Sequence, residues 1–466
     1  MPVLIGIDLG LAYSSIAVAR GGEIQTIPDD HGCLRIPTSH LLSGQGPETT
    51  DDTGDSLADS PGVHVYDTSI AARLESLADE RITTAVLKRL KALAEAFLAE
   101  RVEDVVITVP ASNCDVQREA TRAAGRDAGW NVLRLLNAPT AAAIAHWVDR
   151  GEEYDYSLQA LDPLLVLDIG ASHADATLLE VCDGLFEVKS SAGDSRLGGR
   201  QYDERLFQHF VSQLQPKSHM NCTSAADVLR QKCEQAKISL SIAEEAQLDV
   251  NVTLRRSEFE NICDGLFRST LGLVQKVLQY TKLDKADMKI VLVGGSAKIP
   301  KLRRMIADLF GRSPGELFYP DLACLRGASL HAASLSDNSF PYTLLVLDIV
   351  PHPVQLGLVP DFLIQVFPRN TVVPRESTIC VTLDSFEHLP RYTLLFAGPL
   401  TEDGLVGKFD LSCLWSRSVS GRRQEIRVDV AIDVDGILMA SLVAVDTETG
   451  IRIPIPLEKG RPMTTG

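Results

Sequence analysis

Two stretches of the chain repeat the same pattern of apolar and polar positions. In each, an apolar run ends in an aspartate and a glycine, a few small or polar residues follow, and a second apolar run begins. The first copy carries Asp8 and Gly10, and the second copy carries Asp168 and Gly170. A buried strand that ends in a carboxylate, turns at a glycine and returns is a β-hairpin. The repeat therefore predicts two equivalent hairpins that face each other across a cleft.

The repeated turns have the chemistry of a nucleotide site. Backbone amides in such turns can cradle a polyphosphate, and Asp8 and Asp168 can hold a hydrated divalent cation. A plain turn cap is the alternative for each aspartate on its own, but the pairing favours the metal-water role. The residues that fill the two turns should then decide what the site can still do.

Strand and helix periods alternate over the first 338 residues. The alternation predicts an α/β domain with two lobes, at about 1–160 and 161–338. The expected helices cover residues 83–97, 115–128, 141–148, 202–214, 226–240, 259–280, 301–310 and 325–335. The expected strands outside the hairpins cover 105–109 and 132–136 in the first half and 290–293 in the second. Residues 43–62, rich in Gly, Pro, Ser, Thr and Asp, predict a mobile loop.

The pattern changes after residue 340. Short alternating strands at 362–367, 378–383, 392–396 and 425–432 are separated by Pro and Gly turns, which predicts an all-β sandwich over residues 350–466. The segment that joins the two parts, residues 339–349, is unusually apolar. We expect it to dock on the protein through its four consecutive apolar residues Leu344, Leu345, Val346 and Leu347.

Composition narrows the function classes. The formal net charge of −17 argues against nucleic-acid binding, because an acidic surface repels a phosphate backbone. The nine cysteines contain no C-x-x-C pair and predict reduced thiols in a cytoplasmic protein. The chain begins without a basic, signal-like segment, and no uncharged apolar run approaches the roughly 20 residues of a membrane helix. We expect no membrane association.

The motifs, taken in order, resemble the heat-shock protein 70 (DnaK-type) chaperone family. Similar segments are residues 5–10, 105–125, 131–145, 186–203 and 291–302 in the first part, and 368–371, 407–409 and 435–438 in the second. The resemblance covers nearly the whole chain. It implies an actin-like (ribonuclease H-like, duplicated) ATPase domain followed by an all-β sandwich domain that binds substrate.

The resemblance also implies a set of ligand-binding residues for ATP or ADP with Mg²⁺. Asp8 and Asp168 would hold the metal through water, and Asp175 would lie near the cations on the phosphate side. The implied nucleotide contacts, besides the two metal-water aspartates, are Gly10, Tyr13, Gly170, Gly198, Gly199, Glu234, Lys237, Ser241, Gly294, Gly295, Ser296 and Asp321. Glu234, Lys237 and Ser241 share one helical face, for which a solvated surface is the alternative.

Several positions depart from the family pattern in the catalytic region. The two threonines of the first turn are Leu11 and Ala12, and the Gly-Gly-Gly-Thr of the second turn is Gly170-Ala171-Ser172-His173. The glutamate that helps to place metal water is Ala138. The role of His173 stays open at this point.

Two further departures affect adenine binding and the chemical step. The arginine that stacks on adenine is Ile238. The segment that carries the family's catalytic lysine is largely missing around residues 43–69, and a gene-model artefact there stays an alternative. We expect ATP hydrolysis to be weak or lost and nucleotide binding to be structural. No catalytic residue is assigned, and whether the chain is an enzyme is left open.

These departures favour an atypical chaperone or co-chaperone over an ATP-driven machine. Members with degenerate ATPase sites and no helical lid pair with a J-domain protein near the ribosome. The resemblance therefore implies a J-domain partner, a ribosome or nascent-chain association, and weak binding of unfolded peptide, because the sequence ends at Gly466 without a lid segment. An active ATP-driven peptide chaperone is the alternative, since Arg118 and Pro139 are retained near the family's switch region. A sugar-kinase-like enzyme is disfavoured by the downstream β domain.

Overall fold

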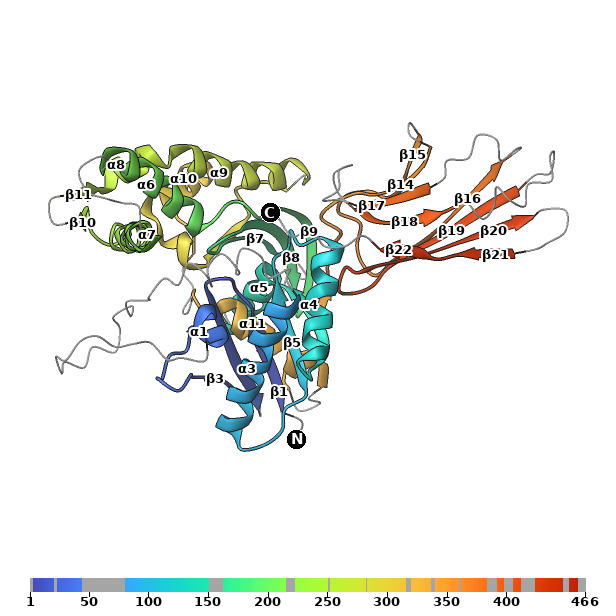
Figure 1. The fold of residues 1–466 in the computed structure, drawn as a ribbon, viewed down its shortest axis with the longest axis horizontal. Helices are drawn as coiled ribbons and strands as arrows, with labels where there is room; N and C mark the ends of the chain where they lie inside the picture. The colour runs from blue at the N-terminus through green and yellow to red at the C-terminus, as the bar shows by residue number, and fades with distance from the viewer. Residues whose placement is uncertain are drawn as a thin grey trace.

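The computed structural model describes fourteen segments of the chain. They are residues 3–20, 23–43, 80–150, 162–214, 223–249, 252–281, 283–315, 320–336, 340–359, 362–383, 392–397, 405–411, 424–446 and 452–459. An α/β unit, from the N-terminus to β13, carries a second unit made of strands, the β unit, which extends away from it (Figure 1). The predicted loop at 43–62 lies outside the described residues, apart from its first residue.

The first predicted hairpin organises one sheet of the α/β unit, the N-terminal sheet. Its strand order is β3-β2-β1-β5-β6, with β1 antiparallel to β2 and parallel to β5. The strands are β1 (Leu4–Asp8), β2 (Tyr13–Arg20), β3 (Glu23–Ile27), β4 (Ile36–Pro37, paired with β2), β5 (Asp104–Val109) and β6 (Asn131–Asn137). Helices α1 (Thr38–Ser43), α3 (Glu80–Leu98), α4 (Asp115–Asp127) and α5 (Ala138–Arg150) belong to the same part of the chain. The register Asp8↔Ser15 confirms the predicted hairpin.

The second predicted hairpin organises the central sheet. Its order is β12-β7-β8-β9-β13, and the register Asp168↔Asp175 confirms the repeat. The strands are β7 (Asp162–Ile169), β8 (Ala174–Cys182), β9 (Leu185–Asp194), β12 (Lys289–Val293) and β13 (Leu345–Leu347). The remaining elements of this unit are α6 (Gly199–Leu214), α7 (Thr223–Ser239), β10 (Glu245–Asp249), β11 (Val252–Arg255), α8 (Arg256–Ile262), α9 (Asp264–Gln279), η2 (Gly295–Lys298), α10 (Pro300–Phe310) and α11 (Ala323–Ser336). The helix predicted over 259–280 is broken at Cys263 between α8 and α9.

Helix α11 joins the two sheets through close backbone approaches. A Cβ atom on Gly327 would lie 1.7 Å from the carbonyl oxygen of Ala141 in α5, and one on Gly6 of β1 would lie 2.3 Å from Oγ of Ser329. Glycine at these two crossings lets α11 pack directly on α5 and β1. One buried apolar cluster accordingly contains Leu4, Ala141, Val166 and Ala328, from both sheets and both helices. The two strand-end aspartates are thus held on a shared, rigid support.

The β unit consists of antiparallel strands in two groups with one common core. One sheet has the order β15-β14-β17-β18-β22 and the other β16-β19-β20-β21. Their bounds are β14 (Val354–Val359), β15 (Phe362–Phe367), β16 (Arg375–Leu383), β17 (Tyr392–Ala397), β18 (Leu405–Asp410), β19 (Gln424–Ile432), β20 (Leu438–Asp446), β21 (Arg452–Ile455) and β22 (Leu457–Lys459). Leu356 and Phe409 of the first sheet are fully buried in one cluster with Val428 and Leu442 of the second.

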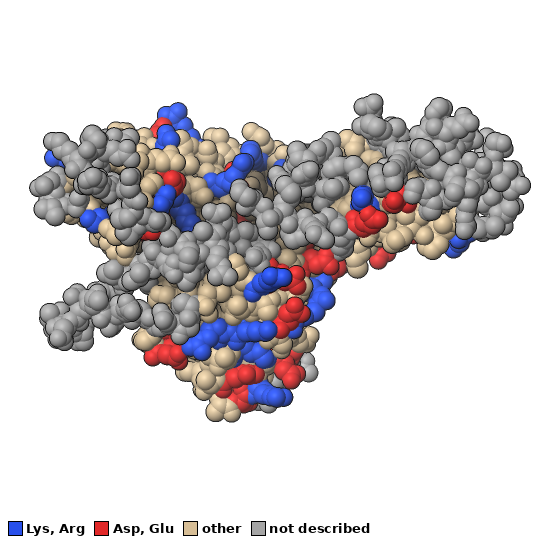
Figure 2. Space-filling view, viewed as in Figure 1, with Lys and Arg blue, Asp and Glu red and all other residues tan. Residues whose placement is uncertain are grey.

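Charged side chains of both signs alternate over α3 and α4 on the face seen in Figure 2. The ion pairs Arg89–Asp30, at 2.9 Å, and Arg20–Glu100 are both solvent-exposed. Exposed pairs of this kind contribute little to stability, typically about 0–1 kcal/mol each. None of the described helices is both long enough and apolar enough to cross a membrane.

Candidate functional site

Three carboxylates meet where the strands of the two sheets end. Asp8 ends β1, Asp168 lies near the end of β7, and Asp175 lies opposite Asp168 at the start of β8. Thr108 donates a hydrogen bond to Oδ1 of Asp8 at 2.7 Å, and the backbone N–H of Ala111 donates to Oδ2 of Asp175 at 3.0 Å. Burial raises the pKa of Asp8, which Thr108 lowers and the nearby Asp168 raises further. The three residues assigned to the metal are therefore brought together.

His173 lies among these carboxylates. Its Nε2 is 3.4 Å from Oδ2 of Asp168, and its side chain is 20% exposed. The ring covers Gly170, because a Cβ atom on that glycine would lie 2.9 Å from Cε1 of His173. Burial alone would lower the pKa of His173, but the hydrogen bond and charge of Asp168, helped by Asp175 and Asp8, raise it to about 9.

Two glycine loops close around the second turn. The N–H of Gly199 donates to the carbonyl of Gly170 at 3.0 Å, and a Cβ on Gly198 would lie 2.7 Å from the backbone of Ala171. The Ser296 hydroxyl also donates to the Gly170 carbonyl, at 3.0 Å. Gly294 has a φ of +84°, and a Cβ there would lie 2.4 Å from the carbonyl of Ile169, so glycine is required. Gly295, the first residue of η2, has open space around its Cα.

The first turn is closed by its own chain. The carbonyl of Gly10 accepts the Thr38 hydroxyl at 2.7 Å, and a Cβ on Gly10 would lie 2.4 Å from the carbonyl of Tyr13. The guanidinium of Arg35 lies over the Tyr13 ring, 4.6 Å from its centroid. Burial raises the pKa of Tyr13, and the charge of Glu234 on α7 adds to this rise.

The helix assigned to the adenosine edge has internal partners for its polar residues. Lys237 donates to Oδ2 of Asp203 at 2.7 Å and to the Gly199 carbonyl at 3.1 Å, and the Ser241 hydroxyl donates to the Lys237 carbonyl at 3.2 Å. Burial raises the pKa of Asp203 to about 6, although Lys237 opposes the rise. Lys237 is therefore already paired with Asp203 of α6 and with the backbone of Gly199.

Asp321, assigned to the closing side of the pocket, pairs with Lys298 and lies 3.7 Å from Nη1 of Arg35. Through Arg35 it is linked to Tyr13. Ile238, which stands where the family pattern has an arginine, is 41% exposed on α7. The contacts thus tie Asp168, Gly170, Gly198, Gly199 and Ser296 into one group around the second turn, and link Tyr13, Arg35 and Asp321 beside the first turn.

The residues at the carboxylate cluster do not fit a divalent metal ion. Oδ2 of Asp168 faces the His173 ring at 3.4 Å, and the ring covers the glycine beside it. A hydrated cation held between Asp8 and Asp168 would have to displace this ring. Among the described residues, no group of three His, Cys, Asp or Glu side chains is placed to ligate one metal ion.

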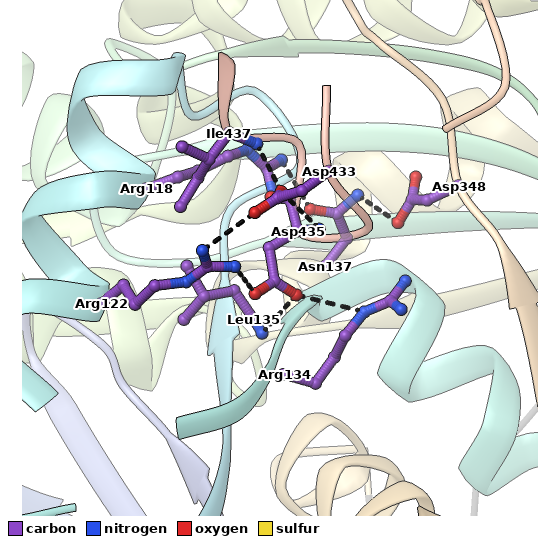
Figure 3. A network of polar contacts seen from close by, with 9 residues as sticks. All are labelled: Arg118, Arg122, Arg134, Leu135, Asn137, Asp348, Asp433, Asp435 and Ile437. Atoms are coloured by element: carbon purple, nitrogen blue, oxygen red, sulfur yellow. Dashed lines mark hydrogen bonds and ion pairs between the residues drawn. The ribbon is translucent and has the colours of Figure 1, made fainter. Parts of the chain in front are cut away.

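A second polar centre connects the two units. Asp435, in the loop between β19 and β20, is 3% exposed and sits against the N-terminal sheet (Figure 3). Its Oδ1 accepts the N–H of Leu135 at 3.0 Å and lies 3.3 Å from Nε of Arg134. Its Oδ2 pairs with Arg122, which also contacts Asp433 at 2.9 Å. One loop of the β unit is therefore held by two arginines of the α/β unit.

Arg118 extends this centre to the segment between the units. Its Nη1 donates to the carbonyl of Asp435 at 3.2 Å, and its Nη2 donates to Oδ1 of Asn137 at 2.7 Å. The amide of Asn137 donates to Asp348 at 2.6 Å (Figure 3). The Asp348 carbonyl in turn accepts the N–H of Val373 at 2.9 Å. Arg118 is 4% exposed. Burial lowers its pKa, and the charge of Asp348 opposes that shift. The network runs unbroken from α4 to the β unit.

The apolar segment before Asp348 forms part of the central sheet. Leu345 pairs with Leu185 in a parallel register between β13 and β9. Leu344 and Val346 are buried at 7% exposure each, Leu347 is half-buried, and Leu345 is 55% exposed. Alternate residues thus face the core, as they do in any strand at a sheet edge.

The sequence interpretation did not assign Asp433, Asp435, Arg122 or Arg134 to a site. Asp435 stood in a recognised segment, 435–438, but a carboxylate before a glycine turn gives no signal of a partner about 300 positions away in the sequence. Only the buried surroundings of that carboxylate distinguish it from a solvated turn residue.

Fold and site define a class of protein in which two sheets, each built on an Asp-x-Gly hairpin, are joined to a β unit by a strand that pairs with the second sheet. Comparison with known proteins identifies the family. A family model described as Hsp70 protein matches residues 61–465. The chain is 32% identical to "Heat shock 70 kDa protein 2" of Paracoccidioides lutzii over 518 residues, which cover 99% of this chain and 78% of that protein.

Two further fungal relatives agree with this match. Proteins named "Heat shock 70 kDa protein" from Emericella nidulans and Neurospora crassa are each 32% identical, over 99% of this chain and 79% of the relative. The chain belongs to the Hsp70 family. Membership implies the actin-like ATPase fold and supports a chaperone role, and the family as a whole binds ATP or ADP with Mg²⁺.

Proposed function

We propose that this protein is an atypical Hsp70-type chaperone or co-chaperone that assists protein folding with little or no ATP hydrolysis. The observation that carries the proposal is His173, whose ring lies against Asp168 and over Gly170 where the second turn would receive phosphate. The contact between the two units is nevertheless complete, through Arg118, Arg122 and Asp435. Groups for coupling the units are present, whereas groups for cleaving phosphate are depleted.

The energies of the lost hydrogen bonds bear more heavily on hydrolysis than on nucleotide binding. A hydrogen bond to a charged group contributes about 1.5–3 kcal/mol, and each 1.36 kcal/mol of lost transition-state stabilisation lowers the rate about tenfold. Loss of the turn hydroxyls at Leu11, Ala12 and His173 therefore lowers hydrolysis by orders of magnitude. Ground-state binding has more independent contributors, since Asp8, the Gly294 loop and the α7 face remain. Nucleotide, where it binds, acts as a structural ligand that stabilises the fold.

The proposed domain organisation follows the units of the fold. Residues 1–338 form the nucleotide-binding domain, 339–349 the linker, and 350–466 a β-sandwich that contacts substrate. The common core of the two sheets, with Phe409 and Val428 in one buried cluster, supports the sandwich. Helix α11, the last helix of the lobe at 161–338, packs against β1 of the lobe at 1–160. In such a sandwich, extended peptide would bind weakly through strand pairing and apolar pockets.

The proposed partners are a J-domain co-chaperone and the ribosome or its nascent chains, in the cytoplasm. The resemblance to degenerate family members supports this assignment, and the family typically binds J-domain co-chaperones and unfolded peptides. The test is affinity purification of the tagged chain from a native lysate, combined with an aggregation assay on a denatured client protein. Stable recovery of a J-domain protein and reduced client aggregation without ATP are expected. A solitary chain that leaves aggregation unchanged would overturn the proposal.

An active ATP-driven peptide chaperone is the second candidate. The observation that favours it is the unbroken path from Arg118 through Asn137 to Asp348, which could transmit a change in the cleft to the β unit. The discriminating measurement is release of a fluorescent unfolded peptide on addition of Mg-ATP. ATP-dependent release would establish this candidate, and an unchanged peptide affinity would exclude it.

A further inference from the structure

Three carboxyl groups lie together at the carboxylate cluster with little access to solvent. Asp168 is 5% exposed and Asp175 is fully buried, and Asp8 is half-buried beside them. Buried carboxyl groups need polar partners. Thr108 supplies one to Asp8 and the backbone N–H of Ala111 supplies one to Asp175, while the ring of His173 lies against Asp168.

The backbone of the turn that carries His173 is held by hydrogen bonds on both sides. The N–H of Gly170 donates to the carbonyl of His173 at 3.0 Å, which closes the turn. On the other side, the N–H of Arg200 donates to the carbonyl of Ala171 at 2.7 Å. A Cβ atom at position 170 would lie 2.9 Å from Cε1, so a side chain there would require the ring to move. The ring therefore packs directly on the glycine of its own turn.

We propose that the His173 side chain takes the place of a divalent cation at the Asp8–Asp168–Asp175 cluster, so that the chain holds no Mg²⁺ there. The ring supplies the donor that faces Asp168 and fills the space that metal-bound water would need. This inference deepens the proposed loss of hydrolysis at the same site and rests on it for the site's identity.

Metal binding by the full-length protein tests the proposal directly. Mn²⁺ serves as the probe, with free Mn²⁺ followed by electron paramagnetic resonance and the melting temperature followed with and without Mg²⁺. The wild-type chain is expected to leave Mn²⁺ free and to melt at the same temperature in Mg²⁺ and in EDTA. His173→Thr empties the ring's space, and we expect it to bind Mn²⁺ roughly tenfold more tightly or better, and to gain stability from Mg²⁺.

Control variants separate a local effect from a general one. His209, a surface residue of α6 that is 34% exposed at its side chain, is changed in the matched control His209→Thr, which should behave as the wild type. If His173→Thr does not fold in EDTA, folding restored by Mg²⁺ supports the proposal, and His173→Gln, which keeps most of the volume, is measured in its place. Stoichiometric Mn²⁺ binding by the wild type, or a folded His173 variant indifferent to both metals, would overturn it. Client aggregation is not part of this readout, so failure here leaves the chaperone proposal untouched.

Discussion

Two histidines are buried in the α/β unit away from the cleft. His146 on α5 is 2% exposed, and burial, aided by the charges of Arg150 and Lys289, lowers its pKa to about 4. His331 on α11 is equally buried, and burial lowers its pKa to about 3. Both are neutral in the folded chain and would be protonated near pH 6.5 once unfolded. They therefore oppose folding in acid.

The sign of this effect gives a pH prediction for His146. The unfolded chain binds more protons between pH 6.5 and about 4, so the free energy of unfolding falls as the pH falls through that window. At pH 5 this one group lowers stability by about 2 kcal/mol. Urea unfolding at pH 7 and pH 5 should show a smaller loss for His146→Gln than for the wild type. An identical loss in both proteins would show that His146 is not the group responsible.

Helix α11 packs against both α5 and β1 and so connects the two sheets of the α/β unit. Gly327 has no room for a side chain against Ala141, whereas a Cβ atom added to Gly272, in the middle of α9, would have no heavy atom within 4 Å. Gly327→Ala should therefore destabilise the protein by several kcal/mol, by forcing α11 away from α5. Gly272→Ala, the matched control, should stabilise it by about 0.5–1 kcal/mol, because alanine favours the helix. Thermal unfolding of the two variants checks both signs, and equal shifts would contradict the packing described.

The local pattern of apolar and polar residues predicts the helices and strands well, but it predicts the long-range contacts between them poorly. Both hairpins followed from apolar runs that end at Asp8 and Asp168, since strand alternation and turn glycines are local properties. The break at Cys263 was missed, because apolar residues keep a helical period across it. The pairing of Asp435 with Arg122 and the placement of His173 over Gly170 needed the folded chain, since neither contact leaves a periodic trace.

At the scale of the whole molecule, the loop of the β unit that carries Asp435 makes a buried contact with the α/β unit. Asp435 accepts bonds from Leu135 and Arg122, and removing a carboxylate from a buried pair of this kind costs about 3–5 kcal/mol. Asp435→Ala should therefore release the β unit from the α/β unit. Small-angle scattering should show a larger radius of gyration, and amide exchange should rise at Leu135.

Asp429 provides the matched control for this change. It lies on β19 with its partners Thr378 and Arg427 on an exposed surface of the same sheet. Asp429→Ala should leave the scattering profile unchanged. If the two variants give the same profile as the wild type, the units are held together by something other than the Asp435 contacts.

The central claim is that this Hsp70 chain keeps the coupling between its units while its phosphate site no longer turns over. The most direct test is a single-turnover experiment, with the protein in excess over labelled Mg-ATP and with bound nucleotide and released phosphate followed together. The account predicts phosphate release no faster than that of Asp168→Ala, with or without retained nucleotide. Phosphate release that is abolished by Asp168→Ala would show that the altered turns still catalyse, and would contradict the account.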